Sequence, residues 1–159
     1  MSSAPTALQF NTGMVRRGLP AAGWREAVTA AGDLLVDGRC VRRGYTEKLV
    51  DIIERFGPYM VIAPGLALVH AQPSADSLQR GISAVTVPDG VDFGHSHYDP
   101  VSLVIGLSTT NASEHLDIVA GIANDLEGSE GLVARAAAAE SDEALVELVR
   151  ASLPALALR

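Results

Sequence analysis

The spacing of apolar residues predicts two helices in the first third of the chain. Over residues 24–38, and again over residues 45–57, apolar side chains recur every three or four positions. This period places them on one helical face, so both segments are expected to be amphipathic helices that pack on a core. A glycine, Gly38 or Gly57, ends each pattern. The predicted faces are Trp24, Ala27, Val28, Ala31 and Leu35 in the first helix, and Tyr45, Leu49, Ile52, Ile53 and Phe56 in the second.

Short apolar runs then replace the helical period and predict strands. Two of the runs are separated by Pro64 and Gly65, a turn signal, so they form either a tight hairpin or two strands joined by a wider bend. The strand candidates are residues 59–63, 66–71, 81–87 and 99–108, with 91–95 as a short edge strand.

Helical spacing returns in the last third, over residues 113–128, 129–140 and 141–153. Ser113 and Ser141 are expected to cap the first and last of these helices. The order of helices and strands predicts a single α/β layered domain over residues 13–159, with a small mixed sheet, after a loose tail over residues 1–12. In the helix over residues 113–128, the shared apolar face is expected to contain Leu116, Val119, Ile122, Ala123 and Leu126.

The composition narrows the class of protein. The chain has 159 residues, 48% of them hydrophobic and 19% charged, which is typical of one ordered domain. A net charge of -7 argues against a nucleic-acid partner. The single cysteine, Cys40, forms no internal disulfide and builds no cysteine-rich metal site. The sequence shows neither a membrane-spanning run nor a signal peptide, so the cytoplasm is the expected location.

The four histidines are the main candidates for chemistry. The chain contains no GxSxG elbow, no Walker loop and no HExxH motif. His70 ends a predicted strand, where a rigid scaffold can present a reactive group, although a structural role is the more frequent one for a lone histidine. His115 lies in the first turn of a predicted helix, where unpaired N–H groups favour a phosphate; an exposed, inert histidine is the alternative.

His95 and His97 form an H-x-H pair in GHSHYD, with Asp99 two residues further on. Together with His70 or His115 they could complete a zinc site. The pattern is weakly specific, so a loop without metal is the competing interpretation.

Three stretches carry a resemblance to a known family: GPYMVIAPGLALVHA, FGHSHYDPVSLVIGLS and SEHLDIVAGIANDL, found in that order. They resemble an enzyme IIA of the bacterial phosphoenolpyruvate-dependent sugar phosphotransferase system, of the mannitol/fructose-type fold family and closest to its ascorbate-type branch. The resemblance runs from about residue 24 to residue 151. It implies a mixed sheet flanked by helices on both faces.

The resemblance implies a phosphohistidine phosphocarrier, a transferase that needs no cofactor and no metal. By position, His70 resembles the phosphoryl-accepting histidine and His115 its active-site companion. HPr would donate the phosphoryl group. A cysteine on enzyme IIB would receive it and phosphorylate a sugar during import through membrane enzyme IIC. A regulatory phosphorylation sensor with the same fold is the alternative, and a homodimer is left open.

Further expectations concern the surroundings of His70. Arg55 and Arg80 are the candidates for stabilising the phosphoryl group. The family usually has proline directly before the reactive histidine, and this chain has Val69 there. Valine favours an extended strand, which holds a similar geometry. An apolar rim that includes Met60 and Leu66 is expected to dock both protein partners.

Overall fold

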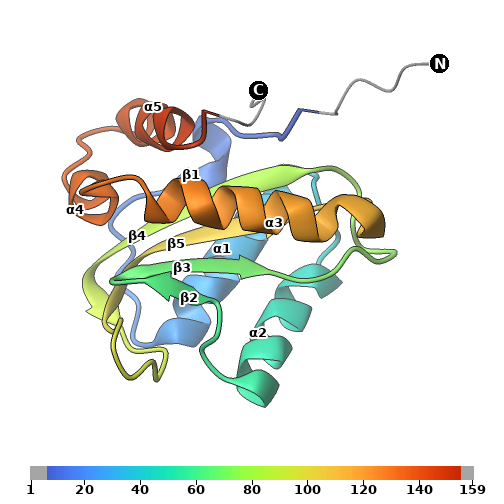
Figure 1. The fold of residues 1–159 in the computed structure, drawn as a ribbon, viewed down its shortest axis with the longest axis horizontal. Helices are drawn as coiled ribbons and strands as arrows, with labels where there is room; N and C mark the ends of the chain where they lie inside the picture. Colours follow the sequence, from blue (N-terminus) through green and yellow to red (C-terminus); the bar gives the residue numbers. More distant parts are fainter. Residues whose placement is uncertain (1–6, 155–159) are drawn as a thin grey trace.

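A five-stranded mixed sheet with the strand order β1-β4-β5-β3-β2 forms the centre of the computed structural model, which describes residues 7–154 (Figure 1). β3 and β5 run parallel, β4 is antiparallel to β5, and β2 is antiparallel to β3. The strands are β1 (Val15–Arg16), β2 (Val61–Ala63), β3 (Leu66–His70), β4 (Gly81–Val91) and β5 (Val101–Ser108).

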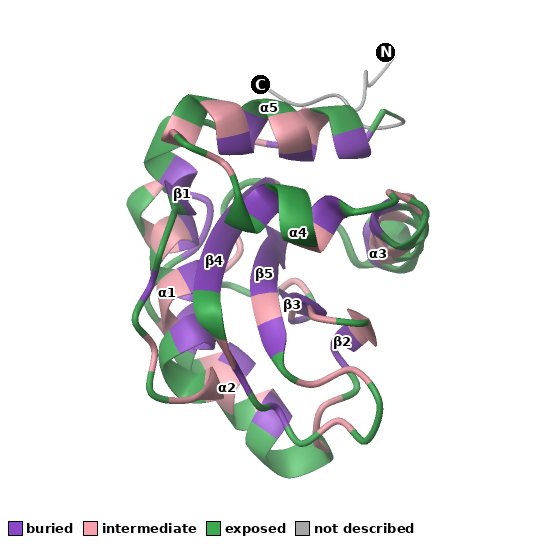
Figure 2. Ribbon diagram, turned by 90° about the vertical axis from the view of Figure 1, so that its left-hand side faces the viewer, coloured by how far each residue is buried: buried purple, intermediate pink, exposed green. Residues whose placement is uncertain are grey.

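Helices cover both faces of this sheet, as the sequence predicts (Figure 2). α1 packs against β4 and β5 on one face, and α2 packs on α1. α3 and α4 lie on the other face, and α5 lies beside β1. After a short 3-10 helix (Thr12–Met14), the helices are α1 (Trp24–Asp37), α2 (Gly44–Phe56), α3 (Ala112–Glu127), α4 (Leu132–Ala137) and α5 (Asp142–Ser152).

β3 is a central strand covered on both sides. Its residues 66–69 are each 2% exposed or less. A strand buried on both faces has a continuous apolar sequence instead of an alternating one, and LALV has this pattern. Of the two interpretations of Pro64-Gly65, the tight hairpin is confirmed, since β2 pairs antiparallel with β3. Gly65 makes the turn with a φ of 75°, which favours glycine.

The expected loose tail is wrong for residues 7–12. Leu8 is 3% exposed and Phe10 is fully buried. The Gln9 N–H donates to the Arg80 carbonyl at 2.9 Å, and the Ile82 N–H donates to the Gln9 carbonyl at 3.0 Å. Because the segment is short and polar in part, its two apolar anchors give no periodic signal. Residues 1–6 of the predicted tail lie outside the described part of the chain.

The segment 91–95 is not an edge strand. Val91 is the last residue of β4, and residues 92–95 continue as a loop. The short strand β1, which no pattern predicted, pairs parallel with β4 and forms the sheet edge instead.

The predicted helices agree with the structure except at their ends and in two apolar faces. The helix expected over 129–140 is only the six-residue α4, preceded by Gly131 in a left-handed conformation. Asn111, not Ser113, caps α3, and Ser141 caps α5 as expected. Phe56 and Leu116 are 70% and 75% exposed, so neither belongs to the core.

Within residues 7–154, no helix has the length and apolar character needed to cross a membrane.

Candidate functional site

The carboxyl ends of two neighbouring parallel strands bring His70 and His115 together. His70 is the last residue of β3 and pairs in register with Leu107 of β5. The chain leaves β5 at Ser108 and enters α3, whose first turns contain His115. The two ring centroids lie 5.8 Å apart, with the ring planes tilted by 48°. Two histidines far apart in the sequence therefore share one site.

The imidazole of His70 has a defined orientation. Its Nδ1 lies 3.0 Å from the backbone carbonyl of Leu68. A carbonyl oxygen only accepts, so Nδ1 carries the proton and Nε2 holds the free electron pair. Burial lowers the pKa of His70; the Leu68 contact acts in the opposite direction, and the nearby His115 lowers the pKa further. The lowered pKa favours the neutral ring, in which Nε2 holds the free electron pair.

His115 is held by a different contact. Its Nδ1 lies 2.7 Å from the hydroxyl oxygen of Thr109, a residue that is 1% exposed. His115 itself is 5% exposed, and burial lowers its pKa as well. Thr109 was not singled out from the sequence. Its signal was a hydroxyl residue placed directly after a strand and shortly before a helix that contains a histidine.

Val69 completes the buried part of β3. Its side chain is fully buried, and the residue pairs in register with Gly106 of β5. A Cβ atom on Gly106 would lie 2.4 Å from the Ser83 hydroxyl oxygen, so this position of β5 accepts only glycine without rearrangement. Close packing on both sides of the strand holds the backbone that presents His70.

The two candidate arginines are placed differently. Arg80 precedes β4, and its Nη2 donates to Oε2 of Glu114, the residue before His115. Arg55 pairs with Asp51 on α2 at 3.1 Å, in an exposed contact within one helix. No contact among the described residues joins Arg55 to either histidine. The structure thus brings only Arg80 into the neighbourhood of the histidine pair.

The loop 93–99 does not have the character of a metal site. The Asp99 carboxylate accepts hydrogen bonds from the backbone N–H groups of residues 93, 94 and 95, at 2.7 to 3.0 Å. Nδ1 of His95 accepts the N–H groups of residues 97 and 98, and its ring stacks on Tyr98 with centroids 4.5 Å apart. The Asp99 carboxylate and Nδ1 of His95 thus bind the backbone of their own loop.

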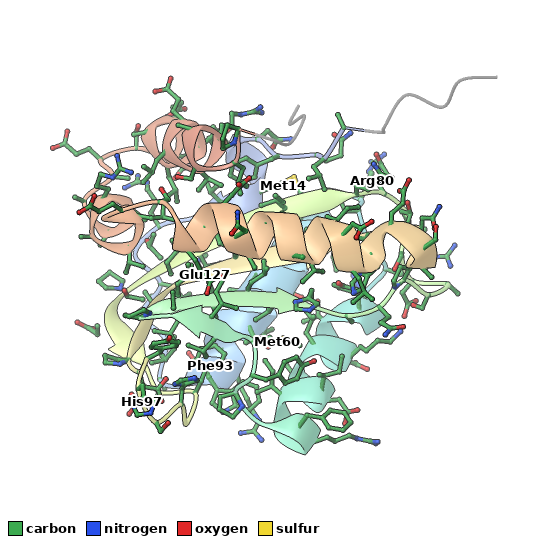
Figure 3. The ribbon with its side chains drawn as sticks, viewed as in Figure 1. Met14, Met60, Arg80, Phe93, His97 and Glu127 are labelled. Atoms are coloured by element: carbon green, nitrogen blue, oxygen red, sulfur yellow. The ribbon has the colours of Figure 1, made fainter. Side chains whose placement is uncertain are left out.

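Within residues 7–154, no group of three or more histidine, cysteine or carboxylate side chains could hold a metal ion. The loop also lies at the opposite end of the sheet from Arg80, as the labels of His97 and Arg80 show (Figure 3). The zinc hypothesis on His95 and His97 is therefore wrong, because the described residues do not bring three suitable ligands together there.

The surface around the pair differs from the expected rim. Met60 and Leu66 are 1% and 2% exposed and belong to the core. The exposed apolar side chains near the two histidine-bearing segments are Leu116, the neighbour of His115, and Tyr59, which precedes β2 and is 56% exposed.

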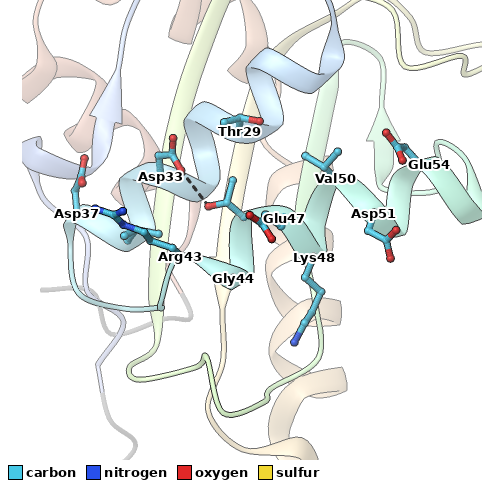
Figure 4. A pocket seen from close by; sticks show the side chains of 12 residues that line it. Thr29, Asp33, Asp37, Arg43, Gly44, Glu47, Lys48, Val50, Asp51 and Glu54 are labelled. Atoms are coloured by element: carbon cyan, nitrogen blue, oxygen red, sulfur yellow. Dashed lines mark hydrogen bonds between the residues drawn. The ribbon is translucent and has the colours of Figure 1, made fainter.

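A separate groove of about 1090 Å³ lies between α1 and α2 (Figure 4). Neither histidine of the pair lines it. Its Asp33 carboxylate accepts from the Thr46 hydroxyl at 3.2 Å, which fastens the two helices to each other. The charged lining residues are Asp33, Asp37, Arg43, Glu47, Lys48, Asp51 and Glu54.

Comparisons with known proteins agree with this geometry. The family model described as "Phosphoenolpyruvate-dependent sugar phosphotransferase system, EIIA 2" matches residues 9–152. The ascorbate-specific PTS system EIIA component of Escherichia coli K12 is 35% identical over 127 residues, 79% of this chain and 82% of that protein.

Two solved structures have a similar fold. The crystal structure of IIA mannitol from Escherichia coli is 28% identical with a TM-score of 0.73, covering 88% of this chain and 98% of that one. The complex of enzyme IIA and phosphorylated enzyme IIB for mannitol, also from Escherichia coli, contains a chain that is 26% identical with a TM-score of 0.73, covering 91% of this chain and 99% of that one.

The match spans both histidine-bearing segments and the whole mixed sheet. EIIA components are phosphotransferase phosphocarriers, and a pair of neutral histidines at a strand end suits that chemistry. The chain belongs to the EIIA 2 family of the phosphoenolpyruvate-dependent sugar phosphotransferase system.

Proposed function

We propose that His70 accepts the phosphoryl group and that Nε2 is the accepting atom. The observation that carries the proposal is the contact between Nδ1 and the Leu68 carbonyl at 3.0 Å. This contact fixes the proton on Nδ1, so the free electron pair is on Nε2. The contact also fixes the ring relative to β3, which a transfer reaction that depends on positioning requires.

In the proposed step, Nε2 of neutral His70 attacks phosphorus in line with the N–P bond of the donor's phosphohistidine. The new Nε2–P bond forms as the donor's N–P bond breaks, and the electrons of the broken bond stay on the donor nitrogen. Nδ1 keeps its proton and its bond to Leu68. The lowered pKa of His70 favours this reaction, because it keeps Nε2 unprotonated.

His115 has the supporting role in this proposal. When the Thr109 hydroxyl donates to Nδ1 of His115, the ring proton is on Nε2. Nε2–H can then donate to a phosphoryl oxygen on His70. The ring lies at the start of α3, where the helix dipole also favours negative charge. Both effects stabilise the charge that develops on the transferring group.

HPr is the proposed donor and a cysteine of enzyme IIB the proposed acceptor, with membrane enzyme IIC as the final, indirect partner. A complex of a similar IIA protein with phosphorylated IIB supports the acceptor. The ascorbate-specific relative supports ascorbate or a related sugar acid as the transported substrate. The exposed Leu116 and Tyr59 are the proposed apolar contacts for both partners, and the relay takes place in the cytoplasm.

The test is reconstitution with enzyme I, HPr and phosphoenolpyruvate. The wild-type chain is expected to gain one acid-labile phosphoryl group and to pass it to an ascorbate-type enzyme IIB. His70→Ala is expected to gain none. Labelling of His70→Ala at the wild-type rate would contradict the assignment. Labelling without any transfer to enzyme IIB would favour the regulatory sensor instead.

A further inference from the structure

An ion pair joins the residue before β4 to the residue before His115. Arg80 Nη2 donates to Glu114 Oε2, and the Arg80 side chain is only 13% exposed while that of Glu114 is 48% exposed. Glu114 lies in the first turn of α3. Figure 3 shows Arg80 at the end of the sheet where α3 begins. The contact therefore connects the sheet to the helix start that carries the second histidine of the site.

The backbone around Arg80 is well fixed. Its carbonyl accepts the Gln9 N–H at 2.9 Å, and Gly81 pairs with Ser108, the last residue of β5. The Arg80 side chain thus extends from a backbone that is bound on one side to the amino-terminal segment and on the other to β5. A partly buried guanidinium in this position is a rigid attachment for whatever it contacts.

The first turn of α3 has few other attachments. Residues 110–114 are exposed. The bonds of the Asn111 side chain to Ser113 lie within the turn itself. A second side-chain contact ties the start of α3 to the end of β5, between Thr109 and His115. Two contacts therefore help to hold His115, one to its own ring and one to its neighbour Glu114.

We propose that Arg80 is a positioning residue for phosphoryl transfer, which acts through Glu114 to hold His115 beside His70. The proposal rests on the proposed function of the histidine pair. Arg80 has a second effect in this arrangement, because its charge offsets the Glu114 carboxylate, which would otherwise repel an incoming phosphoryl group. This role differs from the direct contact with the phosphoryl group that the sequence suggests for Arg80.

The chain contains a matched control for this ion pair. Arg17 follows β1, and its Nε donates at 2.9 Å to Asp142, in the first turn of α5. The Arg17 pair thus also links a sheet strand to a helix start, but α5 carries no histidine. Arg80→Met and Arg17→Met remove equivalent groups, and only the first should affect the site.

The experiment measures two quantities for each variant: the kcat and KM of phosphoryl acceptance from HPr, and the NMR signals of the His115 ring. Arg80→Met is expected to lower kcat on the order of tenfold with little change in KM, and to shift or broaden the His115 signals. Arg80→Lys should have a higher kcat than Arg80→Met. The charge-swap variant, which combines Arg80→Glu with Glu114→Arg, should have a higher kcat than Arg80→Glu alone or Glu114→Arg alone. Arg17→Met should match wild type.

Wild-type kcat and wild-type His115 signals in Arg80→Met would overturn the proposal, and so would altered signals with an unchanged kcat. If Arg80→Met does not fold, Glu114→Ala removes the acceptor of the same contact from the exposed side, with the same expected effects and the same overturning results. If the wild-type chain accepts no phosphoryl group, the proposed function fails, whereas the His115 signals still report whether Arg80 positions that ring.

Discussion

The imidazole rings of His70, at the end of β3, and His115, near the start of α3, lie 5.8 Å apart, centroid to centroid. Each ring uses Nδ1 for a fixed contact, one to a backbone carbonyl and one to a buried hydroxyl. Both rings thus have Nε2 left for chemistry, and burial lowers the pKa of both.

Removing the Thr109 hydroxyl should slow phosphoryl transfer without preventing it. Thr109→Val leaves Nδ1 of His115 without its partner at 2.7 Å, so the ring loses its fixed tautomer. We expect transfer to enzyme IIB to slow about 5- to 30-fold, equivalent to about 1–2 kcal/mol, in a rapid-quench assay. Thr86→Val is the control, since Thr86 is also buried but accepts from the Gly18 N–H. Equal rates in the two variants would remove Thr109 from the site.

A charge at position 116 should weaken partner docking. Leu116 is 75% exposed and follows His115 directly, so an apolar partner surface is expected to cover it. Leu116→Lys should raise the KM for phospho-HPr about tenfold, equivalent to about 1.4 kcal/mol, with a smaller change in kcat. Ala120→Lys adds the same charge one helical turn further along α3 and should have less effect. The docking role fails if both variants raise KM equally.

The stability of the protein should fall at mildly acidic pH. In the unfolded chain the histidine pKa is about 6.5, whereas burial lowers the pKa of His70 and His115 in the folded chain. Below pH about 6.5 the unfolded state therefore binds more protons, so the free energy of unfolding decreases as the pH falls through the lowered folded pKa.

Urea unfolding between pH 7.5 and pH 5 measures this decrease. The His70→Gln variant should show a smaller decrease than wild type, because one of the two groups is gone. His97→Gln, at an exposed loop position, should keep the full decrease. A wild-type slope in His70→Gln would mean that burial of this ring does not control its protonation.

Two glycines in different surroundings should respond to alanine in opposite directions. A Cβ on Gly106 would lie 2.4 Å from the Ser83 hydroxyl oxygen in the middle of the sheet. Gly106→Ala is expected to lower the free energy of unfolding by about 1–3 kcal/mol. Gly121 is exposed on α3 with nothing within 4 Å of the added Cβ, so Gly121→Ala should raise stability by up to about 1 kcal/mol. Denaturant melts check both, and a neutral Gly106→Ala would contradict the packing described for β5.

The sequence predicted the elements of this fold well where their period was strong. α1, α2 and α5 have long apolar faces, and β3 and β5 are continuous apolar runs between turn signals, so local pattern was enough. β1 was missed because two residues cannot show a period, and Phe10 was missed because its burial depends on contacts with distant elements. The exposed Phe56 is the last residue of α2, past the core, whereas Leu116 lies beside the buried His115 on the outer side of α3.

The histidine pair was predicted through the family resemblance, since neither residue alone exceeded the structural alternative. The polar contacts of the site were beyond local pattern. Thr109 binds a residue only six positions further on, but the partner of Arg80 on α3 becomes visible only when the strand order is known. The zinc hypothesis on His95 and His97 failed because a third ligand had to come from a distant segment, and the fold brings none to the loop within residues 7–154.

The most direct measurement of the central claim is the identity of the phosphorylated nitrogen. Phosphorylating the ¹⁵N-histidine-labelled chain with enzyme I, HPr and phosphoenolpyruvate, and recording the ring signals by NMR, reports which ring and which nitrogen carries phosphorus. The account predicts phosphorus on Nε2 of His70, with Nδ1 still protonated and bonded to the Leu68 carbonyl. Phosphorus on Nδ1 of His70, or on His115, would contradict it.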